Sequence, residues 1–122
     1  MTVKNAIDTA DRRMPGNEYS KSEKVTWLKT LEAIWSEFIL TLGIHGAQVD
    51  FTDDNAGLTV KEPYDEIYVI WLIMKMHYYN GEIELYNNSA EAFNNMLQEA
   101  KKSFMRENKS NTQYSFRGHR GV

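Results

Sequence analysis

The run Ile67–Met74 constrains the fold of this chain more than any other segment, because it is apolar on every side. Pro63, Asp65 and Glu66 precede it, an order typical of a helix start, since proline suits the first turn and acids favour the positive end of the helix dipole. The run is β-branched enough for a buried strand, but the continued helical spacing favours a helix. A helix in a small soluble protein usually keeps one polar face. We therefore expect burial against its own domain and against another subunit.

The segment 20–42 carries the clearest helical pattern. Ser20 and Glu23 have the spacing of a capping box, and Gly43 is a typical helix stop. Apolar residues between them recur at helical intervals. The residues expected in the core are Trp27, Leu28, Leu31, Ile34, Trp35, Phe38, Ile39 and Leu42. The residues expected on the solvent-exposed face are Lys24, Lys29, Glu32, Ser36 and Glu37.

A first helix and a long loop flank this segment. Thr2 can cap a helix that runs to about Arg13, where a proline-glycine turn ends it. Residues 43–62 form a loop, in which 48–51 and 58–60 alternate enough for a short β-hairpin. Loops of this length in compact domains are often functional contacts.

The boundary between the third and fourth helices has two readings. The apolar phase passes smoothly across Asn87-Asn88, so the two could form one long bent helix. Typical helix lengths favour a break there, with Asn88-Ser89-Ala90-Glu91 as the cap of the fourth helix. The predicted fold is all-α, a bundle of about four helices in one domain over residues 1–108. An extended or disordered basic arm over 109–122 follows it.

Charge is unevenly distributed along the 122 residues, which have a net charge of −3. Residues 1–99 hold 8 Lys and Arg against 16 Asp and Glu, whereas residues 100–122 hold 6 against 1. An acidic body with a basic arm can be a docking device, and the alternative is a solvated tail. No apolar run reaches the ~18 residues of a membrane span, and the N-terminal segment lacks the apolar core of a signal peptide.

No residue set predicts catalysis, a cofactor or a metal. The absence of cysteine excludes disulfides and thiolate metal sites. Asp50, Thr52 and Asp54 have the spacing of a calcium loop, but Asn55 stands where glycine is needed and Lys61 where the bidentate glutamate belongs. His77 has no nucleophile or metal-ligand pattern around it, so we interpret it as a core or interface residue.

The basic arm offers three binding modes. Tyr114 and Phe116 lie close to Arg117 and Arg120, and such interleaving can bind nucleic acid. The same segment could lie on an acidic protein surface or add a strand to a partner sheet.

Two strings of residues are similar to a known family. They are Pro63-Tyr64-Asp65-Glu66-Ile67-Tyr68 and Asn80-Gly81-Glu82-Ile83-Glu84-Leu85-Tyr86-Asn87-Asn88-Ser89, followed by Phe93-Asn94. The start of the first expected helix, residues 2–8, and the later Tyr19-Ser20 are similar to the same family. Over about residues 2–108 the chain resembles the head–tail connector, or neck adaptor, proteins of tailed bacteriophages and prophages. The arm is not covered.

The resemblance implies a helical structural protein of the virion neck that assembles in the host cytoplasm. It implies a ring of about twelve copies beneath the portal, joining capsid to tail and surrounding the DNA channel. The implied partners are the portal protein, a neighbouring stopper or tail-terminator protein, other copies of the chain, and passing DNA without sequence-specific binding. The residues expected to place helices or contact neighbours are Tyr64, Asp65, Tyr68, Tyr86, Asn87 and Asn88, with Arg117 and Arg120 in the arm.

A small helical nucleic-acid-binding or regulatory protein is the alternative. The acidic body argues against it, because duplex binders normally present a basic face.

Overall fold

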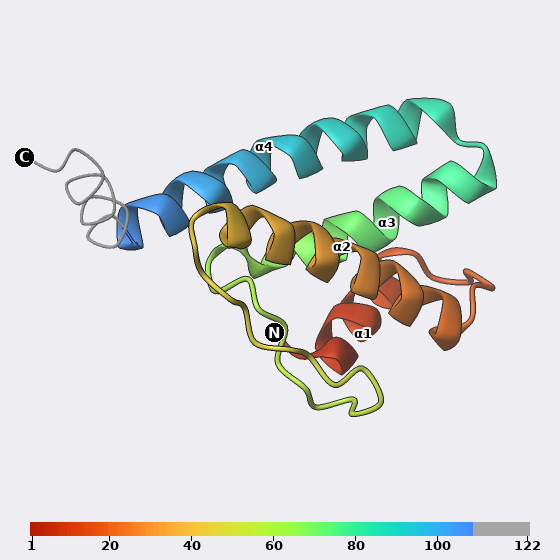
Figure 1. Cartoon of the computed structure of the whole chain (residues 1–122). Helices are drawn as coiled ribbons and strands as arrows, with labels where there is room; N and C mark the ends of the chain where they lie inside the picture. Colours follow the sequence, from red (N-terminus) through yellow and green to blue (C-terminus); the bar gives the residue numbers. More distant parts are fainter. Residues whose placement is uncertain (109–122) are drawn as a thin grey trace, which may run out of the picture.

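The computed structural model describes residues 1–108, which fold into an all-α bundle (Figure 1). The elements are α1 (Val3–Arg13), α2 (Lys21–Thr41), a 3-10 helix (Tyr64–Glu66), α3 (Ile67–Asn80) and α4 (Ile83–Glu107). α3 and α4 form an antiparallel pair, and α2 lies beside them with α1 at its side. The predicted fold class is confirmed. Within this part of the chain, no helix combines the length and the apolarity that crossing a membrane requires.

α3 is the central helix, and this position explains why its first turns are apolar on every side. It packs against α1, α2 and α4. Ile67, Tyr68, Val69 and Leu72 are completely buried by these neighbours. The burial that the sequence suggested a second subunit would provide is therefore supplied by the chain itself.

α2 begins and ends as predicted, but its polar face is partly covered. The Ser20 hydroxyl accepts a hydrogen bond from the Glu23 amide at 3.1 Å. The prediction that Lys24 and Glu32 are solvent-exposed is wrong, since both are buried. The Lys24 ammonium lies 2.8 Å from the carboxylate of Asp11 in α1. The spacing within α2 carried no information on the segments that cover it.

The loop between α2 and the 3-10 helix closes over the start of α1, and the predicted hairpin is wrong. No strand forms between residues 1 and 108, and one isolated bridge joins Thr2 to Gly57. The Val3 and Lys4 amides donate to the carbonyls of Ala56 and Asp54 at 3.0 and 2.9 Å. The first amides of a helix have no partner inside it, so the loop satisfies donors that a hairpin would have left unpaired.

The boundary between α3 and α4 lies at Gly81, so the predicted break at Asn87-Asn88 is wrong. Gly81 has φ 74°, a left-handed conformation that glycine adopts at little cost. Its amide donates to Tyr78, and the Glu82 amide donates to His77 at 3.0 Å. This pair of bonds is the Schellman motif that ends helices. The motif turns the chain back on itself, and Asn87-Asn88 lies inside α4.

Candidate functional site

Tyr68, one of the predicted contact residues, lies in the interior. Its hydroxyl is hydrogen-bonded to the Glu32 carboxylate and accepts from the Val60 amide at 2.8 Å. The Thr59 hydroxyl donates to the same carboxylate at 2.7 Å. Burial, then the charge of Glu32 and the bond to it, raises the pKa of Tyr68 far above its ordinary 10.0. Tyr68 therefore ties the loop to α2 and α3 and is not accessible to a partner.

The other predicted contact residues are dispersed. Tyr64 and Asp65 are half-buried, and the Asp65 carboxylate lies 3.4 Å from the amino group of Met1. Tyr86 is half-buried in the first turns of α4, and Asn87-Asn88 is exposed beside it. Tyr64 and Asp65 are neighbours in the 3-10 helix, and Tyr86 and Asn87-Asn88 are neighbours in α4, so the set does not form one site. The predictions for Arg117 and Arg120 lie outside the described residues.

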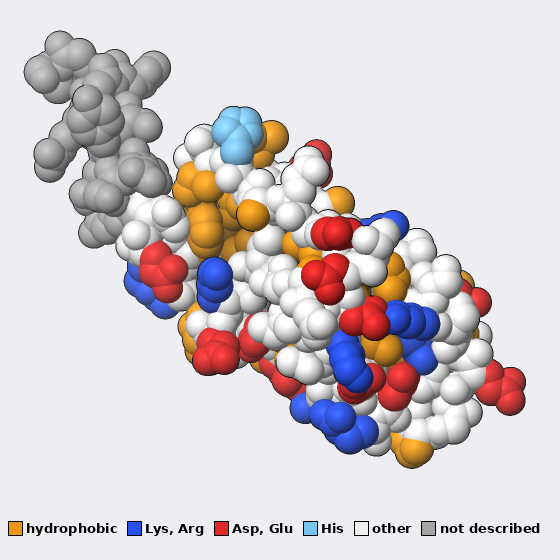
Figure 2. Space-filling model, turned by 90° about the horizontal axis from the view of Figure 1, so that it is seen from below, with side chains coloured by type: hydrophobic (Ala, Val, Ile, Leu, Met, Phe, Trp, Pro, Cys, Tyr) orange, Lys and Arg blue, Asp and Glu red, His pale blue; other side chains and the backbone are white. Residues whose placement is uncertain are grey.

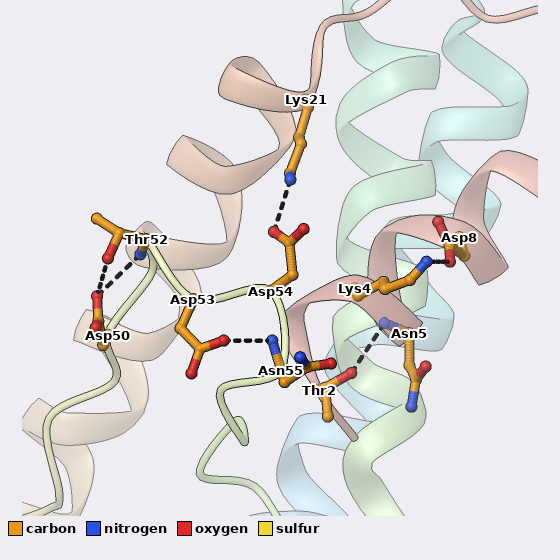
Figure 3. A network of polar contacts seen from close by, with 10 residues as sticks. All are labelled: Thr2, Lys4, Asn5, Asp8, Lys21, Asp50, Thr52, Asp53, Asp54 and Asn55. Atoms are coloured by element: carbon orange, nitrogen blue, oxygen red, sulfur yellow. Dashed lines mark hydrogen bonds and ion pairs between the residues drawn. The ribbon is translucent and has the colours of Figure 1, made fainter.

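Residues 50–55 form an acidic segment of the loop, and the carboxylates of this segment are bonded to other groups of the chain (Figure 3). The Asp50 carboxylate accepts from the amide and hydroxyl of Thr52 at 3.0 and 2.6 Å, and these bonds lower the pKa of Asp50. Asp54 instead forms an ion pair with Lys21 at 2.6 Å. No group of three or more metal-ligating side chains occurs among residues 1–108. The segment thus anchors the loop to the starts of α1 and α2.

An exposed aromatic surface surrounds the turn between α3 and α4. The Tyr79 ring stacks on Trp27, with centroids 5.7 Å apart and planes at 10°, and it contacts Tyr78 at 5.1 Å. Tyr78 and Tyr79 are 56% and 61% exposed. We call this the turn surface, whose members are Tyr19, Trp27, Tyr78, Tyr79, Ile83, Leu85 and Tyr86. Clusters of exposed apolar side chains mark interaction sites more often than single ones do.

Hydrogen bonds fix the conformation of the turn surface. The Tyr19 hydroxyl donates to the Asn80 side-chain oxygen at 2.6 Å, and the Asn80 amide donates to Glu82 at 2.9 Å. His77 Nδ1 lies 3.1 Å from the same carboxylate. The hydrogen bonds from Asn80 and His77 lower the pKa of Glu82 below 4.5. An anionic Glu82 therefore connects the end of α3 to the start of α4.

The turn surface is acidic at its rim. From Met76 through Tyr86 the chain has two acidic residues, Glu82 and Glu84, and no Lys or Arg. Glu18 and Glu23 line an adjoining groove with Tyr19 and Asn80. Burial, together with the charges of Glu23 and Glu82, raises the pKa of Tyr19. The aromatic rings are thus bordered by negative charge.

A second apolar surface lies where α2 ends. Leu40 is 52% exposed, and Ile34 and Phe38 lie beside it in a groove that also contains Lys101 of α4. The Lys101 ammonium sits 5.2 Å from the centre of the Phe38 ring. We call Ile34, Phe38, Leu40 and Ile44 the α2-end surface. Figure 2 shows hydrophobic side chains gathered at this end of the molecule.

The two surfaces lie at opposite ends of the bundle. α2 and α4 both start near the turn and end at the other end of the molecule (Figure 1). Trp35 and Phe38 contact Phe104 near the end of α4. Trp27 instead contacts Tyr79, which lies just before the turn that leads into α4. The turn surface and the α2-end surface therefore face opposite ends of the bundle.

Comparison of the chain with protein-family models, curated proteins and solved structures finds no match.

Sequence reasoning missed most of the turn surface. The helical spacing that favoured a helix continues from Ile67 through Tyr78 to Leu85, yet α3 ends at Asn80 and both Tyr78 and Leu85 are exposed. The available signal was the pair Tyr78-Tyr79 directly before Asn80-Gly81. Aromatic residues beside a helix stop lie at a turn, where solvent reaches them.

Proposed function

We propose that this chain is a non-enzymatic subunit of a tailed-phage neck, forming a ring beneath the portal that joins capsid to tail. The observation that carries this proposal is the pair of unlike apolar surfaces at opposite ends of one bundle. A ring forms through head-to-tail contacts, so each copy must present two different faces. The turn surface and the α2-end surface fit this requirement.

The sequence strings that resemble neck adaptors add independent support, and they map onto specific elements. One string spans the 3-10 helix and the start of α3, where Tyr68 joins the loop to the core. The other spans the Gly81 turn and the start of α4. Both strings therefore cover the features that set the shape of the subunit and of its turn surface.

The test is a pull-down with the portal protein of the same phage, together with mass spectrometry of purified particles. We expect the portal to retain the wild-type chain and the particles to contain it. Tyr78→Ser with Tyr79→Ser should reduce its incorporation into particles, whereas the matched control Asn94→Ser with Asn95→Ser, on exposed positions of α4, should not. Absence from particles together with no portal binding would contradict the proposal. Salt-dependent binding to duplex DNA with neither of these would favour the nucleic-acid-binding alternative.

A further inference from the structure

The chain outside the structure is complementary to the turn surface. Residues 109–122 contain three Lys and Arg, no Asp or Glu, and two aromatic residues, Tyr114 and Phe116. The turn surface combines exposed tyrosines with an acidic rim. Arginine binds carboxylates through paired hydrogen bonds and packs on aromatic faces. The basic and aromatic residues of the segment therefore match the acidic rim and the tyrosines of the turn surface.

The length of α4 decides which copy of the chain can make this contact. α4 has 25 residues and starts at the turn, so its end lies about 37 Å from the turn. The segment leaves from that far end, and nine fully extended residues carry Arg117 only about 30 Å. Tyr114 and Phe116 reach less far still. Tyr114 and Phe116 therefore stop short of Tyr78 and Tyr79 in their own chain, whereas twelve extended residues carry Arg120 about 40 Å, far enough to reach the turn.

We propose that the turn surface binds the C-terminal segment, residues 109–122, of a neighbouring copy of this chain. Arg117 and Arg120 pair with the acidic rim, and Tyr114 and Phe116 pack on Tyr78 and Tyr79. The segment departs beside the α2-end surface, so the contact links one end of a copy to the opposite end of the next. The inference rests on the proposed assembly role, because a ring places successive copies head to tail.

The experiment is photo-crosslinking in mixed full-length copies. Phe116 is replaced by benzoylphenylalanine in unlabelled protein, which is mixed at high concentration with ¹⁵N-labelled protein and irradiated. We expect crosslinks from position 116 to labelled peptides covering residues 78–86. Crosslinks confined within one chain, crosslinks spread evenly over the surface, or no crosslinks would each overturn the proposal. Crosslinks formed only when portal protein is added, and only to it, would also overturn it.

Charge exchange tests the chemistry of the same contact. Arg117→Glu with Arg120→Glu in the crosslinking copy should reduce the yield about tenfold, as should Glu18→Lys with Glu84→Lys in the labelled copy. Mixing the two variants should restore the yield, because opposite charges meet again. The matched control Glu62→Lys with Glu99→Lys makes the same charge change away from the turn and should leave the yield unchanged. A control effect equal to that of the turn variant, or failure of the exchange to restore crosslinking, would overturn the proposal.

The neck function and the docking of residues 109–122 on a neighbouring copy can be refuted separately. Crosslinks between copies can persist even if the chain is absent from particles, which would refute the neck function alone. The chain can be present in particles without the crosslink, which would refute the docking of the segment alone.

Discussion

Tyr68, in the first turn of α3, is completely buried, whereas Tyr78 and Tyr79 at its end are 56% and 61% exposed. The buried hydroxyl bonds to Glu32 and Val60, while the exposed Tyr79 ring stacks on Trp27 and contacts Tyr78. One end of α3 therefore stabilises the fold through burial, and the other presents aromatic surface that remains more than half exposed. The difference separates residues that support the subunit from residues available for a neighbour.

Removing the buried ring should have the largest effect on stability. We expect Tyr68→Ala to lower the free energy of unfolding by about 3–5 kcal/mol, because it opens a cavity at the centre of the bundle. Tyr79→Ala removes an equal side chain from the exposed end and should cost about 1 kcal/mol through the lost stack on Trp27. Urea unfolding followed by circular dichroism measures both. Equal losses of stability in the two variants would contradict the distinction between the buried and the exposed end of α3.

Removing only the buried hydroxyl isolates the polar network. Tyr68→Phe leaves the Glu32 carboxylate without one donor and the Val60 amide without its acceptor, so we expect a loss of about 1–3 kcal/mol. Tyr78→Phe, its exposed counterpart, should change the free energy of unfolding by less than about 0.5 kcal/mol. Hydrogen exchange should also show faster exchange at Val60 in Tyr68→Phe. An unchanged Val60 amide would contradict the proposed anchoring of the loop.

The turn itself should be sensitive to its backbone conformation. Gly81→Ala places a side chain at φ 74°, and we expect a cost of about 1–2 kcal/mol. No atom lies within 4 Å of the added Cβ, so the cost is one of conformation and not of collision. Thermal unfolding measures it, with Ala92→Gly as a reference for the same pair of residues at an ordinary helical position. A neutral Gly81→Ala variant would show that the turn is not held as described.

The smallest effect concerns the Glu82 carboxylate. Since Asn80 and His77 lower its pKa, Asn80→Ala should raise that pKa toward 4.5, as measured by NMR titration of the side-chain carboxyl carbon. The pKa is lower in the folded chain than in the unfolded one. The contribution to stability is therefore present above the unfolded value and is lost as pH falls through the folded value. Asn87→Ala should leave the titration unchanged, and an unaltered pKa in Asn80→Ala would contradict the assignment.

Local signals in the sequence were sufficient for most of the helices. The hydroxyls of Thr2 and Ser20 cap α1 and α2 as expected, and α2 stops just before Gly43. These signals act within a few residues of one another. The apolar spacing of α2 also identified the core residues of that helix, Leu28, Leu31, Trp35 and Ile39, because burial follows the helical period.

Contacts between distant segments were not predictable in the same way. Glu32 is buried because Thr59 and Tyr68, 27 and 36 residues away, converge on it. The loop lost its expected hairpin because its carbonyls meet the amides at the start of α1. At Gly81 the stop signal was present, but a continuing apolar period through Leu85 outweighed it. The candidate site depends on that turn, so most of its residues were missed.

We infer that, in a neck ring, the turn surface of each copy is covered by a neighbouring copy. Electron cryomicroscopy of the neck of particles that contain this chain tests it most directly. We expect a ring beneath the portal in which Tyr78 and Tyr79 are buried against the next copy. A ring in which this surface faces solvent, or density for the chain anywhere other than the neck, would contradict it.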